Sequence, residues 1–178
     1  EELSLELLET VFNQCMEHPS SELLFVFSRM LDATKKTEDY LAAYFPYLIQ
    51  LLQSPEIELQ VAVIPCITSL CKWSSLLVYD IYAPLMEKLW EVVTSSDETK
   101  DSLKPPAIDC IATVAQVIGE SIENYLEDFS DYFVKNIKGD DPSIGVACLQ
   151  ALEAFAPYLT LQWQRNSCLF FLPSSMSI

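Results

Sequence analysis

The sequence has little of what strand-rich folds and phosphate-binding loops require. Only three of its 178 residues are glycine. Glycine supplies the tight turns and bulges of sheets because it tolerates backbone angles that other residues avoid. Its scarcity favours long helices and leaves few positions for a phosphate-binding loop. No apolar run approaches the roughly 18 residues that a bilayer-spanning helix needs, so we expect no transmembrane segment.

The residues and motifs of common enzymes are also missing. The one histidine, His18, precedes Pro19 at a predicted helix end, so a role at that terminus is favoured over a role as general base. The patterns GxGxxG, GxxxxGKS/T, GxSxG and HExxH do not occur. We therefore predict a protein that is not an enzyme and has no cofactor and no metal site.

Positive charge is scarce as well. The chain has 26 acidic and 10 basic residues and a formal net charge of −16. Nucleic-acid binding needs a basic stripe, and anionic membranes attract basic segments, so we expect neither as a direct ligand. The charge is compatible with a basic protein partner and equally with an acidic surface that only keeps the protein soluble.

Cysteine is present, but not in metal-binding or disulfide patterns. No CxxC pair or histidine cluster accompanies the six cysteines. Cys66 and Cys110 fall at equivalent places in a repeated stretch, where the third copy has Ala151, so we interpret them as small buried side chains. Reduced thiols in turn favour the cytosol or nucleus. The cysteines are Cys15, Cys66, Cys71, Cys110, Cys148 and Cys168.

The repeated stretch is the main positive signal. Residues 59–67, 103–111 and 144–152 align with one another, and the copies begin 44 and 41 residues apart. A period of about 40 to 47 residues built from paired helices is typical of HEAT and armadillo repeats. Such arrays are solenoids that present extended binding surfaces, so the pattern predicts a binding protein.

Apolar spacing near 3.6 residues and helix-terminus signals predict an all-α fold. We expect a right-handed α-α superhelix of about four antiparallel helix pairs, at about 1–36, 38–74, 77–118 and 121–158. Residues 161–178 form a divergent tail or the start of a further repeat. The chain lacks the features of a signal peptide, and we expect it to be one stretch of a longer solenoid. Pro46, Pro65 and Pro84 fall inside predicted helices, which they should bend or break.

Residues 141–152 resemble the HEAT consensus of Asp-Pro, a Val-Arg pair and an alanine-rich apolar helix. Gly145 stands where that consensus has arginine, and Gln60 and Lys104 stand there in the other copies. The usual Asp-to-Arg ladder between repeats is therefore expected to be weak or absent. Such divergence from the consensus is more typical of the importin-β (karyopherin) family than of the regular phosphatase scaffold. Residues 44–52 and 107–119 are similar to repeats of that family.

The resemblance implies a segment of a nuclear transport receptor, found in cytoplasm and nucleus, that binds basic cargo. It further implies contacts of the full-length protein with the GTPase Ran and with Phe-Gly nucleoporins. First helices would form the outer convex face and second helices the inner concave face. The alternative is a HEAT scaffold subunit that organises a stable multiprotein complex.

Two sets of candidate residues follow from these positions. A basic partner would meet acidic residues of the second helices, which otherwise are ordinary charges on the solvent side of amphipathic helices: Glu56, Glu58, Asp101, Asp109 and Glu153. An apolar groove between neighbouring first helices would be lined by side chains whose alternative role is to fill the core: Phe45, Leu48, Leu85, Trp90 and Tyr132.

Overall fold

The computed structural model describes residues 2–34 and 38–170, and this part of the chain is helical without a strand. The all-α prediction is thus confirmed. In chain order the elements are α1 (Glu2–Glu17), α2 (Ser21–Thr34), α3 (Glu38–Leu51), α4 (Ile57–Trp73), α5 (Ser75–Val93), the 3₁₀ helix η1 (Glu98–Leu103), α6 (Lys104–Ile118), the 3₁₀ helix η2 (Gly119–Tyr125), α7 (Leu126–Asn136) and α8 (Pro142–Phe170).

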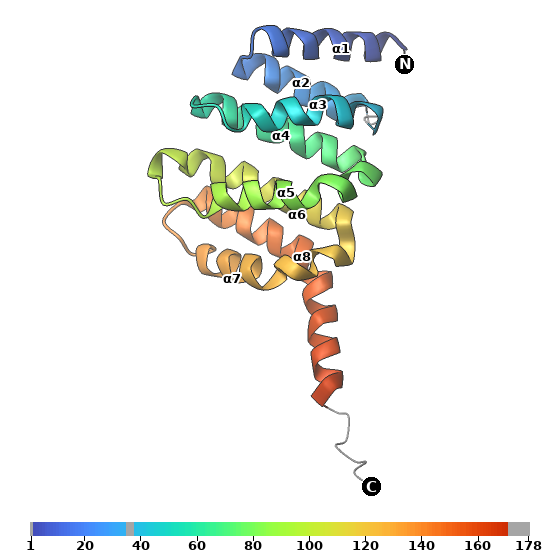
Figure 1. The fold of residues 1–178 in the computed structure, drawn as a ribbon. Helices are drawn as coiled ribbons and strands as arrows, with labels where there is room; N and C mark the ends of the chain where they lie inside the picture. Colours follow the sequence, from blue (N-terminus) through green and yellow to red (C-terminus); the bar gives the residue numbers. More distant parts are fainter. Residues whose placement is uncertain (1, 35–37, 171–178) are drawn as a thin grey trace.

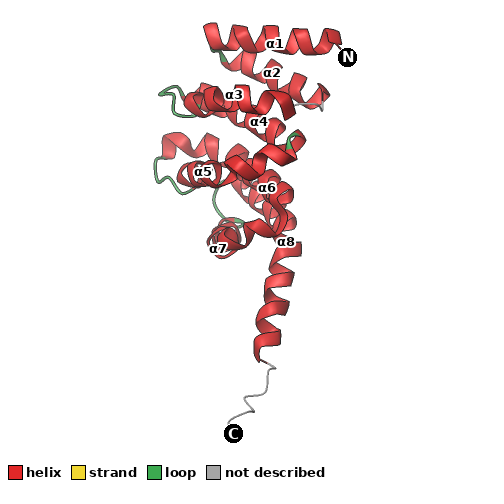
Figure 2. Cartoon of the chain, turned by 45° about the vertical axis from the view of Figure 1, so that its right-hand side comes forward, coloured by secondary structure: helices red, strands yellow, loops and turns green. Residues whose placement is uncertain are grey.

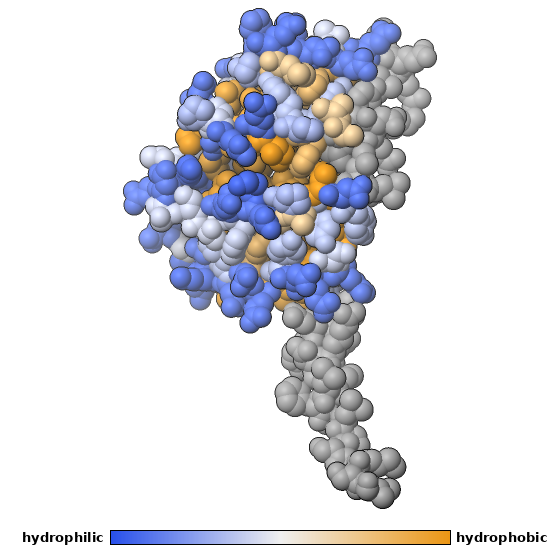
Figure 3. Space-filling view, in the orientation of Figure 1, coloured by the Kyte–Doolittle hydropathy of each residue, from blue (hydrophilic) through white to orange (hydrophobic). Residues whose placement is uncertain are grey.

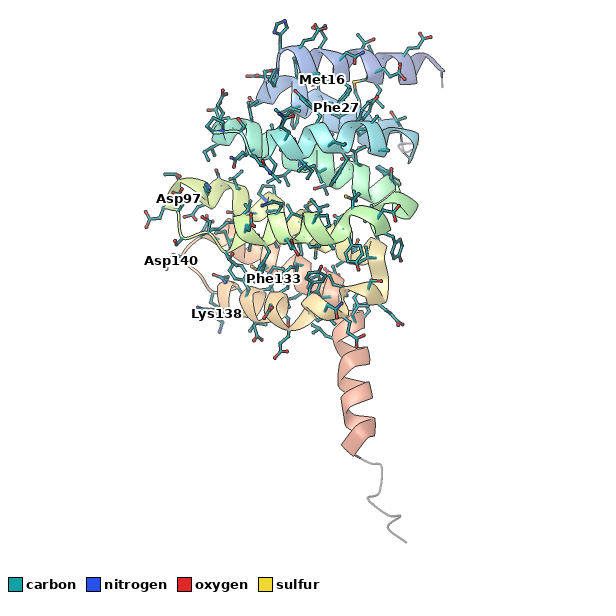
Figure 4. All side chains as sticks on the ribbon, viewed as in Figure 1. Met16, Phe27, Asp97, Phe133, Lys138 and Asp140 are labelled. Atoms are coloured by element: carbon teal, nitrogen blue, oxygen red, sulfur yellow. The ribbon has the colours of Figure 1, made fainter. Side chains whose placement is uncertain are left out.

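The helices stack in pairs, α1 with α2, α3 with α4, α5 with α6 and α7 with α8. First helices form one layer and second helices the other, so the chain is a two-layer helical repeat array (Figures 1 and 2). Turns within a pair gather at one edge, where Asp97, Lys138 and Asp140 lie (Figure 4). The right-handed twist of the superhelix stays a prediction.

Local signals explain where several second helices begin. The Ser20 hydroxyl accepts a hydrogen bond from the backbone N–H of Leu23 (3.2 Å), which caps α2. Asp141 caps α8 in the same way, through the backbone N–H of Ser143 (2.8 Å). α6 begins just before Pro105, as proline in a first helical turn allows.

The prolines were expected to bend or break their helices, and the breaks do not occur, whereas the bends stay a prediction. Pro46 lies inside α3, Pro65 inside α4 and Pro84 inside α5, and each helix continues on both sides. Proline removes one backbone hydrogen bond. A helix that packs along its neighbours has enough remaining contacts to continue past that loss.

The cysteine prediction is confirmed at the repeated position. Cys66, Cys110 and Ala151 are all fully buried in the core, and Cys15, Cys71 and Cys148 are buried free thiols. Of Cys168 the structure describes the backbone alone.

Three boundaries differ from the sequence prediction. The expected polar loop at 95–101 includes the start of η1. Residues 119–125 form a 3₁₀ helix in place of the first turns of a first helix. Gly119 begins it with a φ of 57° and a ψ of −128°, a backbone conformation that residues with a Cβ atom rarely adopt.

α8 does not end near Tyr158 but runs to Phe170, extending beyond the packed pairs (Figures 1 and 2). The tail therefore begins as a continuation of α8, and residues 171–178 lie outside the described part.

Candidate protein-binding surface

The second helices form the more closely packed layer. α2 packs extensively on α4, α4 on α6 and α6 on α8, whereas the contact between the first helices α3 and α5 is much smaller. We call the surface formed by α2, α4, α6 and α8 the inner face. That this face is the concave side of the array stays a prediction.

Two of the acidic residues that were predicted to meet a basic partner line the same groove on this face. Asp109 of α6 and Glu153 of α8 both line a cavity of about 620 Å³, which we call the acidic groove. Helical spacing brings Thr113 and Gln116 to the same side as Asp109. The remaining lining residues belong to α6 and α8: Ala112, Gln150, Ala154, Pro157 and Tyr158. A groove with two carboxylates and two amide side chains can pair with cations and hydrogen-bond an extended backbone.

Asp109 also faces a cation of the chain itself. Desolvation by its neighbours raises the pKa of the Asp109 carboxyl, and the positive charge of Lys72 opposes that rise. The Lys72 ammonium lies 4.9 Å from the centre of the Trp73 ring, within the range of a cation–π contact. The Trp73 indole N–H in turn donates to an Asp32 carboxylate oxygen (3.3 Å).

Asp32, Lys72 and Asp109 line a second cavity of about 350 Å³, which we call the central groove. It lies between α2, α4 and α6, and its lining residues are Asp32, Pro65, Thr68, Ser69, Lys72, Pro106, Asp109, Thr113 and Gln116. Three residues line both the central and the acidic groove: Asp109, Thr113 and Gln116.

A third cavity, the apolar groove, lies between α2 and α4 and has a volume of about 740 Å³. Its lining residues are Ser21, Glu22, Phe25, Val26, Ile57, Glu58, Val61, Ala62, Pro65 and Ser102. The sequence prediction missed Phe25 and Val26. Their signal was available, because both are apolar yet fall outside the α2 stripe that contains Leu24, Phe27 and Leu31.

The other predicted acidic residues do not reach the acidic groove. Glu58 lines the apolar groove, and Glu56 is exposed immediately before α4. Asp101 lies in η1 and forms an ion pair with Lys104 (2.7 Å). All three lie near the N-terminal ends of second helices, where a carboxylate also complements the helix dipole.

The residues predicted for an outer groove fill the interfaces between repeats. Leu48 and Leu85 are buried in the core, and Phe45 is partly buried against it. The Trp90 ring stacks on Phe129 with centroids 4.3 Å apart, and the Tyr132 hydroxyl donates to the Val93 carbonyl oxygen (2.9 Å).

None of these five residues lines a separate cavity of about 380 Å³, which we call the outer groove. Its walls come from α3, α4, α5, η1 and the turn that follows α3, and its lining residues are Ile49, Leu52, Gln53, Gln60, Lys88, Glu91, Val92 and Lys100. Figure 3 views the face that carries the first helices and shows hydrophobic side chains between the levels of α3 and α5, framed by hydrophilic ones.

Among the described side chains, no three His, Cys, Asp or Glu residues come together as a metal site would require. Burial raises the pKa of the Cys15 and Cys148 thiols to about 11 and that of Cys110 to about 12, so these thiols stay protonated near neutral pH. No helix in the described ranges is both long and apolar enough to cross a bilayer.

Comparison with known proteins identifies related sequences for most of the array. The family described as "Importin subunit beta-1-like, TPR repeats" matches residues 2–138, which run from α1 through α7. TPR and HEAT repeats are both tandem pairs of antiparallel helices, with periods of about 34 and about 40 to 47 residues. No curated protein matches the chain. The match includes Asp109 and ends before Glu153.

Proposed function

The chain belongs to the importin subunit beta-1-like family of helical-repeat proteins, and we propose that its acidic groove binds a basic segment of a protein cargo. The observation that carries the proposal is the placement of Asp109 and Glu153, from neighbouring second helices, along one groove. Lysine or arginine side chains of an extended segment would pair with these carboxylates. Gln116 and Gln150 offer hydrogen bonds to its backbone.

The charge of the whole chain supports the same kind of ligand. A formal net charge of −16 attracts a basic segment over a distance and speeds its encounter with the inner face. Pairing at exposed carboxylates is screened by salt, so affinity should fall as ionic strength rises.

The test measures fluorescence anisotropy of a labelled peptide of lysine, arginine and serine on the full chain. Neutralising both carboxylates, with Asp109→Asn and Glu153→Gln, should weaken binding by about three- to tenfold, as the loss of two exposed ion pairs implies. The variant carrying Glu87→Gln and Glu127→Gln is the matched control, because both residues are exposed on first helices, α5 and α7. Equal affinities for the double variant and the control variant would refute the proposal.

Family membership suggests a role in nucleocytoplasmic transport, with the protein in both cytoplasm and nucleus. In that role Ran would be a partner, and the phenylalanine of a Phe-Gly nucleoporin would enter the outer groove. Ile49, Leu52 and Val92 give that groove an apolar part. Pull-downs with Ran loaded with GTP and with Phe-Gly repeats test the transport role. Binding to neither would favour the alternative of a scaffold subunit in a stable complex.

A further inference from the structure

The apolar groove exposes large apolar side chains that the described helices do not cover. Phe25 is 63% exposed and Val26 is 46% exposed. Both lie on α2 and face a groove whose other wall includes Ile57 and Val61 of α4. Leaving a phenylalanine and a valine side by side in water forgoes the free energy of their burial. An apolar groove of this size is typical of a binding site for a partner's side chain.

The charges around the apolar groove define the chemistry of its ligand. Glu22 and Glu58 line it and are exposed, and its other polar lining residues, Ser21 and Ser102, are neutral. None of the described residues that line it is a lysine or an arginine. The groove therefore suits a large apolar side chain with a cationic residue next to it.

The three inner-face grooves are neighbours that share lining residues. Pro65 lines both the apolar and the central groove, and Asp109 lines both the central and the acidic groove. Together they form a track that crosses α2, α4, α6 and α8. The track is apolar at α2 and α4 and polar and acidic at α6 and α8, so its two ends select different side chains.

We propose that the apolar groove holds an aromatic or large aliphatic anchor of the same basic segment that the acidic groove binds. The ligand class is then an extended protein segment with a large apolar residue at one end, a cation beside it and further basic residues at the other end. This inference rests on the proposed function and makes it more specific. A segment with basic residues alone would bind more weakly than one that also carries the apolar anchor.

Fluorescently labelled peptides with equal lysine and arginine content test the anchor. Two of them carry phenylalanine, at the amino or at the carboxyl end, separated from the basic residues by a Gly-Ser spacer. The third carries serine in its place. Burial of a phenylalanine predicts that one anchored peptide binds the chain between about tenfold and about a hundredfold more tightly than the serine peptide. Phe25→Ser should remove that gain.

Val134→Ser is the matched control, since Val134 is 62% exposed on the first helix α7, and it should leave the gain intact. The inference is overturned if neither anchored peptide binds more tightly than the serine peptide, or if the gain survives Phe25→Ser. It is also overturned if sedimentation shows a dimer that Phe25→Ser abolishes, because a second copy would then occupy the groove.

The Asp109→Asn and Glu153→Gln double variant separates this inference from the proposed function. In one outcome, an anchored peptide gains affinity through Phe25, and the double variant binds the peptides as tightly as the unmodified chain does. That outcome supports the anchor and contradicts binding of basic residues in the acidic groove. Weaker binding in the double variant without any anchor gain supports the acidic groove and contradicts the anchor.

Discussion

Gly145 approaches the backbone of Ile137 so closely that a Cβ atom on Gly145 would lie 2.7 Å from the Ile137 carbonyl oxygen. The contact joins the first turns of α8 to the residue that directly follows α7. A backbone oxygen cannot move aside as a flexible side chain can. The fourth repeat therefore needs glycine at this position in order to close its turn.

Gly145→Ala should therefore destabilise the protein by about 1 to 3 kcal/mol, as overpacked sites do. Gly145→Arg, which restores the HEAT consensus residue, should destabilise it further. Urea unfolding followed by circular dichroism measures both effects. Val146→Ala, at the exposed next position, is the control and should change little. A more stable Gly145→Ala protein, as helix propensity alone would predict, would contradict the contact.

The role of Gly145 could not be predicted from the sequence, although the helix pairs could. The repeat period and the apolar stripes identified the helix pairs, because both are local patterns of burial. The same alignment indicated that Gly145 weakens a ladder of charges, but its role depends on how closely α7 and α8 approach. That approach is a tertiary distance and leaves no periodic signal in the sequence.

Among the candidate residues, too, some positions could be predicted from the sequence and others depend on tertiary packing. The spacing along α6 and α8 could place Asp109 and Glu153 on the solvent side of second helices. Leu48 and Leu85 were predicted to line a groove between first helices, yet both side chains are buried in the core. Phe25 could have been noticed as an apolar residue outside the core stripe of its helix. That it lines a groove depends on the position of α4, which the sequence does not show.

Tyr132→Phe tests the interface between α5 and α7. Its hydroxyl donates to the Val93 carbonyl oxygen at 2.9 Å, and loss of one such bond should destabilise the protein by about 1 kcal/mol. Thermal or urea unfolding measures the change. Tyr79→Phe is the comparison, because Tyr79 is 48% exposed and its hydroxyl bonds are longer, at 3.3 and 3.4 Å. An effect of Tyr79→Phe as large as that of Tyr132→Phe would contradict this ranking.

The buried thiols predict how stability depends on pH. An exposed thiol in the unfolded chain loses its proton near pH 8.5, whereas burial raises the pKa of folded Cys110 to about 12 and of Cys15 and Cys148 to about 11. Between these values the folded chain binds more protons than the unfolded chain. The free energy of unfolding should therefore fall as pH rises from about 9 to about 11.

Urea midpoints at pH 8, 9.5 and 10.5 measure that fall. Cys110→Ala should make it less steep, and Ala151 at the equivalent position indicates that alanine fits there. A pH slope that Cys110→Ala leaves unchanged would argue against a contribution from the Cys110 thiol.

Lys72 should oppose basic ligands on the inner face. It lines the central groove, and its charge acts on Asp109. Lys72→Gln should raise the affinity for a lysine and arginine peptide by roughly two- to fivefold, the size of an exposed charge interaction. Lys138→Gln removes the same charge from the turn edge seen in Figure 4 and should have a smaller effect. Equal gains would mean that net charge, and not the track, sets the affinity.

Charge reversal in the acidic groove tests the central claim most directly. The variant carrying Asp109→Lys and Glu153→Lys is titrated by fluorescence anisotropy with a lysine and arginine peptide and with a matched glutamate peptide. If the two carboxylates bind a basic segment, the variant loses affinity for the basic peptide and gains it for the acidic one. The outer-helix variant with Glu87→Lys and Glu127→Lys has the same net charge and should keep the original preference. An equal change of preference in both variants would contradict the claim that the inner face is the binding surface.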